Sequence, residues 1–308
     1  MNQQFDRIVY CGLLVRGNLK GAMAYLRQYP EYRALYQKYE AVFEREEYLI
    51  YPEDAEIDAL LLIYQKYYRE VFFLEVDAKK AEENMKNRFA AFLGIDAGKM
   101  TFQELEETQI ADSFRKKCFQ FLGGETSGYY GPYIWKTTEL KTYDVELPEG
   151  NQSYPVQFLD GFIAKSWLDY LSFGKTGTGG WSNGDGLLNC VRAVYDLASE
   201  SFQVSFLKHE AQHAMDLARY PEMQPTDLEY RAKLVELIYT KERNLLAVFA
   251  QDADTSNKEN GHALAASRIA EEFTRESGGN PLAIAETQSI ARKLLQKSNA
   301  EIKEKYAR

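Results

Sequence analysis

Hydrophobic residues recur at helical spacing through the first part of the chain. In the segment "AEIDALLLIYQKYYREVFFLE", apolar side chains follow one another at steps of three and four, which places them on one face of a helix. These side chains are Ile57, Leu60, Leu61, Tyr64, Tyr68 and Phe72. From about residue 18 to 122 the pattern predicts a bundle of helices in which the many tyrosines serve mainly in packing.

The pattern changes after "LGGETSGYYGP" (residues 122–132), where glycines and a proline cluster. "YIWKTTELKTYDVELP" and "YPVQFLDGF" then read as strands, "IAKSWLDYLSF" as a short helix and "LLNCVRAVYDL" as an apolar strand. We therefore predict an N-terminal helical domain over residues 1–124 and a second domain over residues 125–308. The fold class would be α+β, mostly helical, with a small antiparallel sheet in the second domain.

Glycine-rich and helical segments complete the second domain. The run "GKTGTGGWSNGDG" (residues 174–186) lacks the GxxxxGK[ST] order of a phosphate-binding loop, so we expect turns and an exposed strand there. "SESFQVSFLKHEAQHAMDLARY" predicts one helix, capped by Ser199 or Ser201 and ended by Pro221 and Pro225. A helix over "LEYRAKLVELIYTKERNLLAVF" and two further helices follow.

The composition excludes several classes of partner. The 308 residues are 45% hydrophobic and 14% aromatic, which is enough to bury one large core or two smaller ones. There are 37 basic and 46 acidic side chains, and the net charge of −9 argues against nucleic acid or an anionic membrane as the main partner. No apolar run approaches the roughly 18 residues expected of a membrane helix.

The three cysteines point to a reducing compartment. Cys11, Cys118 and Cys190 are scattered and form no CxxC pair, so we expect free thiols. The first apolar stretch, "IVYCGLLV", is followed by Arg16 and Asn18 instead of the small residues of a cleavage site, and it does not resemble a secretion signal. The sequence therefore predicts a cytoplasmic protein.

The candidate chemistry lies in "HEAQH", residues 209–213. Residues four apart on a helix share a face, so His209 and His213 can direct imidazole nitrogens at one metal ion. Glu210 projects beside that face, where its carboxylate can act as the general base for a water molecule. Imidazole ligands favour zinc over calcium or magnesium, which prefer oxygen. The alternative is a chance spacing on a polar helix.

A catalytic zinc site usually has three protein ligands, so one more is needed. Residue 219 is an arginine, which leaves carboxylates as candidates. They are Asp216, Glu222, Asp227, Glu229 and Glu236. We favour Glu229, because it falls on the first turn of the next helix, which can fold back against the HEAQH helix. Glu236 is the second choice, and in a third interpretation Glu229 only caps its own helix, in a capping box with Thr226.

HEAQH followed by a glutamate on the next helix resembles the gluzincin group of zinc metallopeptidases, the clan of thermolysin-like catalytic domains. The resemblance covers roughly residues 130–250. It implies a zincin-like domain, zinc as the cofactor, peptide-bond hydrolysis and a sheet edge that binds extended peptide, for which "GGWSNG" is the candidate. The N-terminal helical half matches no such family.

The resemblance also implies two supporting residues. Many such families have an ExxxD arrangement whose aspartate orients a zinc-bound histidine. Lys233 stands at that position here, so Asp216 is the candidate for the role, with a solvent-facing Asp216 as the alternative. A histidine beyond the third ligand often stabilises the oxyanion in these families. His262 shares a face with Ala266, Ile269 and Phe273, so we expect it to point inward, either as this catalytic residue or as a core histidine.

These patterns predict a zinc-dependent peptidase that acts on peptides or proteins. A zinc-binding regulatory or interaction protein without peptidase activity is the alternative. A helical, metal-free protein is the third possibility, and metal analysis of the purified protein separates it from the other two.

Overall fold

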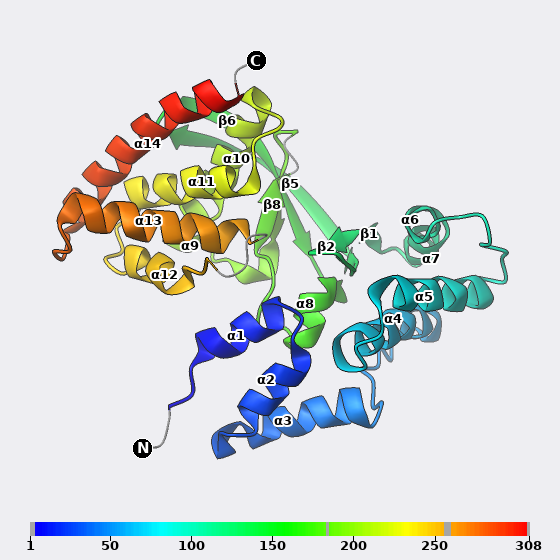
Figure 1. Ribbon diagram of the computed structural model, residues 1–308. Helices are drawn as coiled ribbons and strands as arrows, with labels where there is room; N and C mark the ends of the chain where they lie inside the picture. Colours follow the sequence, from blue (N-terminus) through cyan, green and yellow to red (C-terminus); the bar gives the residue numbers. More distant parts are fainter. Residues whose placement is uncertain (1–3, 183–184, 256–259, 307–308) are drawn as a thin grey trace. The chain divides into compact units, whose positions relative to one another are not determined.

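The computed structural model describes residues 4–182, 185–255 and 260–306, and the chain divides into two compact units. Unit 1 is Met1–Thr137 with Gly161–Gly177, and unit 2 is Thr138–Asp160 with Thr178–Arg308. Helices make up most of both units and the strands form small sheets (Figure 1). The predicted α+β class is therefore confirmed.

Unit 1 is a bundle of helices, as the spacing of its apolar residues predicts. They are α1 (Arg7–Val15), α2 (Leu19–Leu26), α3 (Arg33–Tyr39), α4 (Ala55–Tyr68), α5 (Ala78–Leu93), α6 (Phe102–Leu105), α7 (Ala111–Lys116) and α8 (Ser166–Leu171). Three π-helical turns extend or join them, namely η2 (Glu40–Glu44), η3 (Arg69–Phe73) and η4 (Glu106–Ile110). The predicted apolar face of α4 and η3 is buried except for Leu61, which is half-buried.

Unit 1 also includes residues that the sequence assigns to the second domain. Strand β1 (Gln120–Leu122) pairs with β4 (Tyr133–Trp135), which pairs with β7 (Ala164–Lys165), and β2 (Glu125–Thr126) pairs with β3 (Tyr129–Tyr130). The Tyr39 hydroxyl donates to the Leu171 carbonyl at 2.6 Å. These contacts between distant segments explain why the units divide elsewhere than at residues 124 and 125.

Unit 2 contains a four-stranded sheet in the order β5-β6-β9-β8. The strands are β5 (Thr137–Leu147), β6 (Gly150–Asp160), β8 (Gly180–Ser182) and β9 (Leu188–Val191). β9 is antiparallel to the edge strand β8 but parallel to β6, so this sheet is mixed. A parallel pair needs a long connection, and residues 161–177 of unit 1 form most of it.

Six helices pack with this sheet in the described part of unit 2. They are α9 (Glu200–Gln203), α10 (Leu207–Arg219), α11 (Pro225–Tyr239), α12 (Leu245–Asp252), α13 (Gly261–Ser277) and α14 (Ile284–Tyr306). Two predicted single helices are each interrupted, between α9 and α10 and between α11 and α12. Ser199 caps α9, and the prolines separate α10 from α11, as predicted.

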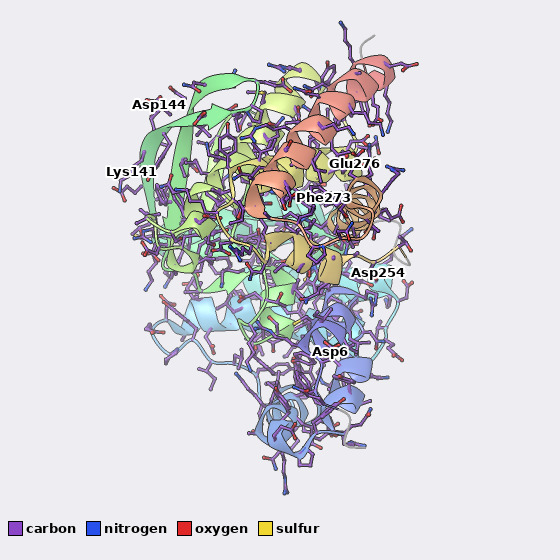
Figure 2. The ribbon with its side chains drawn as sticks, turned by 90° about the vertical axis from the view of Figure 1, so that its left-hand side faces the viewer. Asp6, Lys141, Asp144, Asp254, Phe273 and Glu276 are labelled. Atoms are coloured by element: carbon purple, nitrogen blue, oxygen red, sulfur yellow. The ribbon has the colours of Figure 1, made fainter. Side chains whose placement is uncertain are left out.

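Helix α11 is the centre of unit 2. It packs against α10, α13 and α14, and α10 in turn contacts strands β8 and β9 (Figure 1). Every residue from Leu228 to Ile238 is buried. On the outer strand β5, by contrast, the side chains of Lys141 and Asp144 are exposed (Figure 2). The sheet and the outer helices therefore hold the α10–α11 pair inside the unit.

A buried carboxyl group lies in the core of unit 1. Glu106 accepts hydrogen bonds from the Tyr64 hydroxyl and from the backbone N–H of Gly124, each at 2.7 Å. Burial nevertheless raises its pKa to about 7. Between its usual pKa of 4.5 and this value, the folded protein holds a proton that the unfolded chain has released. The stability that Glu106 contributes is therefore present below pH 4.5 and lost as the pH rises towards 7.

We predict that Glu106→Gln removes this pH dependence. The wild type should lose up to about 3 kcal/mol of unfolding free energy, relative to the variant, as the pH rises from 4.5 to 7. Denaturant unfolding of both proteins across this range measures the difference, with the exposed neighbour substituted in Glu107→Gln as a control. A difference between wild type and Glu106→Gln that stays constant with pH would contradict the prediction.

Candidate metal centre

The HEAQH residues occupy the first half of α10, and the helix has two distinct sides. Leu207, Ala211 and Ala214 are buried among the apolar core residues of unit 2. His209 and His213 are also buried, at 7% and 8% exposed, and their ring centroids are 4.6 Å apart. Their spacing of one helical turn therefore brings both imidazoles to one place, as the sequence predicts.

Glu229 of α11 meets both histidines. Its Oε2 lies 3.5 Å from His209 Nε2, and its Oε1 lies 3.4 Å from His213 Nε2. The two Nε2 atoms are 2.8 Å apart. Among the residues that the structure describes, these three form the one group of histidine, cysteine and acidic side chains whose ligand atoms all lie within 4.8 Å of one another.

The three residues fit a divalent metal ion. Ligand atoms at the usual zinc distances of about 2.0–2.1 Å in a tetrahedron are about 3.3–3.4 Å apart. The two distances from Glu229 to the histidines, 3.4 and 3.5 Å, match this value, and the two histidine nitrogens, 2.8 Å apart, would separate slightly around an ion. Glu229 Oε2 is buried and has no hydrogen-bond partner in the described chain, although His262 Nδ1 lies 2.7 Å away as an ion-pair partner. A metal ion beside the two histidines would give this buried carboxylate a further cationic partner.

Glu236 orients one of the histidines. It lies seven residues after Glu229, which is about two helical turns, so both carboxylates project from one side of α11. Glu236 Oε1 lies 2.7 Å from His209 Nδ1. A proton on Nδ1 that is donated to this carboxylate leaves the Nε2 lone pair free to bind a metal. Glu236, the second choice for the third ligand, therefore lies on the Nδ1 side of His209, away from the Nε2 atom that faces His213 and Glu229.

The assignment of an orienting role to Asp216 is wrong. Asp216 is buried, but its carboxylate accepts hydrogen bonds from Arg231, at 2.7 and 2.9 Å, and from Gln212 at 2.9 Å. Lys233, at the family's aspartate position, lies with its Nζ 4.4 Å from the centre of the Phe249 ring. This role was not predicted for Glu236 from the sequence, although the seven-residue spacing of the two glutamates could have indicated it.

The other third-ligand candidates and the capping interpretation do not fit the structure. Glu222 is exposed, and Asp227 pairs with Lys305 at 2.7 Å. Helix α11 begins at Pro225, one residue before Thr226, and no side chain caps its N-terminus. Glu229 therefore lies in the second turn of α11 instead of the capping position, with its carboxylate directed at the histidines.

His262 does not point inward, in contrast to the prediction. Its side chain is 67% exposed, because it belongs to the first turn of α13, whereas Ala266, Ile269 and Phe273 further along the helix are buried. Its ring nevertheless lies nearly parallel to the His209 ring, with centroids 6.5 Å apart. Together with its ion-pair contact to Glu229, this places His262 at the solvent side of the site.

The charges at the site are strongly coupled. Burial disfavours the charged form of His209, but Glu229 and Glu236 outweigh it and raise its pKa to about 10. Burial, reinforced by the charge on His209, lowers the pKa of His213 to about 3. Burial would raise the pKa of Glu229, yet His209 and His262 hold it well below its usual range. A proton on His209, which lies between Glu229 and Glu236, thus supplies part of the positive charge that a metal ion could supply.

Glu210 has the properties of a proton acceptor. It is half-buried, and burial raises the pKa of its carboxyl group, while the neighbouring His209 lowers it and Glu229 raises it further. A carboxylate whose pKa is raised towards neutral is better suited to general-base catalysis than a fully solvated one. It faces the charges of the ligand residues without being one of them.

Comparisons with protein-family models, curated proteins and solved structures find no match for this chain. The resemblance to gluzincins therefore depends on HEAQH and Glu229, and any function has to be argued from the site itself.

We predict that the protein binds about one zinc ion per chain and that His213→Ala and Glu229→Ala abolish or strongly weaken this binding. Each variant removes one of the three converging ligands. Metal analysis after dialysis against a low zinc concentration measures the occupancy, with Thr226→Ala on the same helix as a control. Zinc occupancy that is indifferent to His213→Ala would exclude the site.

A second prediction concerns Glu236. Because it fixes the orientation and the proton position of His209, Glu236→Gln should weaken zinc binding by about 10- to 100-fold without abolishing it. Glu222→Gln, at an exposed carboxylate that touches no histidine, should leave zinc affinity unchanged. Competition with a chromogenic chelator gives both affinities, and an equal loss in the two variants would contradict the role of Glu236.

Proposed function

We propose that unit 2 is a zinc-dependent peptidase domain, with His209, His213 and Glu229 as the metal ligands. The observation that carries this proposal is the convergence of the three buried side chains, from α10 and α11, with their ligand atoms all within 4.8 Å of one another. Zinc suits a set of two imidazoles and one carboxylate, and such a set leaves a coordination position for a substrate or water.

Glu210 is the proposed general base. A zinc ion at the site supplies Lewis-acid polarisation of a carbonyl group and lowers the pKa of a water molecule. Glu210 follows His209 in α10, so its carboxylate lies at the edge of the ligand group and accepts the proton that the attacking water loses. Transfer of this proton to the leaving amine completes the cleavage of a peptide bond. His262, on the exposed side of Glu229, is placed to donate to a substrate oxygen.

The edge strand β8 is the proposed binding surface for the peptide. An extended peptide can add to the edge of a sheet as a further strand. β8 lies beside α10, and Gly180 fits there because a Cβ would meet the Phe206 ring at 2.2 Å. Asn183 and Gly184 of the predicted "GGWSNG" edge lie outside the described residues.

We assign this peptidase to a reducing, cytoplasmic compartment. The support is that Cys11, Cys118 and Cys190 are all free in the structure. Within the described residues, no helix has both the length and the apolar character that a membrane span requires.

We predict that Glu210→Gln keeps zinc but loses activity. Glutamine has nearly the same shape as glutamate and cannot accept the proton, so hydrolysis should fall by about 10²–10⁴-fold at unchanged metal content. The measurement is cleavage of a quenched peptide library by wild type and variant at matched zinc occupancy. Glu222→Gln, an exposed carboxylate at the start of the next loop, is the control and should retain full activity.

Equal rates for wild type and Glu210→Gln would refute the assigned mechanism. Stoichiometric zinc in a wild-type protein that cleaves no peptide of the library would instead favour the regulatory, non-catalytic interpretation.

A further inference from the structure

Unit 1 contains a cavity of about 340 Å³, which lies within the size range of small-molecule sites. Aromatic side chains form much of its wall, namely Tyr51, Tyr64, Tyr68, Tyr170 and Phe173. All of its lining residues belong to unit 1, whereas the metal centre belongs to unit 2. The proposed peptidase chemistry therefore gives this cavity no role.

The hydroxyl groups of two lining tyrosines are already occupied. Tyr64 donates to Glu106 at 2.7 Å, and Tyr170 donates to the side-chain oxygen of Gln65 at 2.9 Å. Their rings, and not their hydroxyls, are therefore the parts available to a ligand. Aromatic faces and edges pack best against another flat ring.

Hydrogen bonds hold the rim of the cavity in place. Leu49 and Ile50 line it and are 41% and 76% exposed, an unusual position for two adjacent large apolar residues. The buried Gln65 side chain holds this rim in place: it accepts from the backbone N–H of Leu49 at 2.9 Å and donates to the Leu49 carbonyl at 2.8 Å. These bonds prevent the apolar rim from folding into the cavity.

Helix α8 contributes two further features to the cavity wall. Ser166 begins this helix and Phe173 lies two residues beyond its end, and both have positive φ angles, +65° and +51°, which are unusual for residues other than glycine. Ser166 is only 5% exposed, so its side chain belongs to the buried part of the wall.

The charged residues of the lining leave one positive charge. Lys165 pairs with Asp169 at 2.9 Å, so these two charges balance. Lys38 is exposed at the edge of the lining, its Nζ lies 4.0 Å from the centre of the Phe173 ring, and no ion pair joins it to an acidic side chain among the residues described. A ligand with one negative charge would restore the balance.

We propose that this cavity binds a small aromatic carboxylic acid, whose rings lie among the tyrosines and whose carboxylate lies beside Lys38. The uncompensated charge on Lys38 sets the preference for an anion, and the volume and aromatic wall set the preference for a flat, ring-containing body.

Three probes of one shape test the proposal: 2-naphthoic acid, its uncharged amide and 2-naphthylmethylamine. Isothermal titration of the full chain at neutral pH should show one site for the acid, with a Kd below about 1 mM. The amide should bind about fivefold more weakly, as expected for one ion pair at a protein surface, and the amine more weakly still. Lys38→Gln should abolish the preference for the acid and Lys38→Arg should retain it, whereas Lys141→Gln on an exposed strand should change nothing.

Variants that fill the cavity test whether the acid binds there. Leu61→Trp and, independently, Ala164→Phe place a larger side chain in the lining. Each should weaken the binding of 2-naphthoic acid by at least about tenfold. Leu140→Trp, at a residue that is 62% exposed in β5, is the matched control. Circular dichroism checks that the variants fold. If neither Leu61→Trp nor Ala164→Phe folds, the affinities of the three probes for the wild type and for Lys38→Gln still test the proposal.

The absence of saturable binding of the acid at a few times 1 mM would overturn the proposal. Equal affinities of the acid and the amide for the wild type would overturn it as well, and so would binding that persists unchanged in folded Leu61→Trp or Ala164→Phe. None of these measurements depends on zinc or on peptidase activity.

Discussion

The contact between α10 and α11 is the interaction on which unit 2 depends. Every residue of α11 from Leu228 to Ile238 is buried, yet this stretch carries four charged side chains, and an unpaired charge in such a place is very costly. Each of the four meets a specific partner. Arg231 binds Asp216 of α10, Lys233 lies over the Phe249 ring, and Glu229 and Glu236 meet His209 of α10. The pairing fixes how α10 and α11 lie together, and with it the place where both histidines of HEAQH converge.

The same pairing explains why the site suits a cation. Two buried carboxylates, Glu229 and Glu236, lie against one histidine, and in the absence of a metal a proton on His209 compensates part of their charge. A divalent ion bound by His209, His213 and Glu229 would compensate more of it. Binding of a metal and release of a proton are therefore coupled, so zinc affinity should fall as the pH decreases. His213, whose pKa is held near 3, is already neutral and ready to bind.

The sequence predicted those parts of the structure that depend on local spacing. The helical face of α4, the four-residue step from His209 to His213 and the proline-bounded ends of α10 and α11 follow from periodicity and backbone chemistry. The sequence did not predict the contacts between distant segments. The parallel β6–β9 pair, the return of residues 161–177 to unit 1 and the contact of Glu236, instead of Asp216, with His209 all depend on tertiary packing. His262 was misplaced because an apolar stripe along α13 says nothing of where its first turn leaves the core.

The position of zinc in a crystal of the zinc-loaded protein, located by its anomalous scattering, tests the metal site most directly. We predict a single strong peak at about 2.0–2.2 Å from Nε2 of His209, Nε2 of His213 and a carboxylate oxygen of Glu229, with Glu236 hydrogen-bonded to His209 from behind. A peak at any other group of residues, or at Glu236 with Glu229 turned away, would contradict the account.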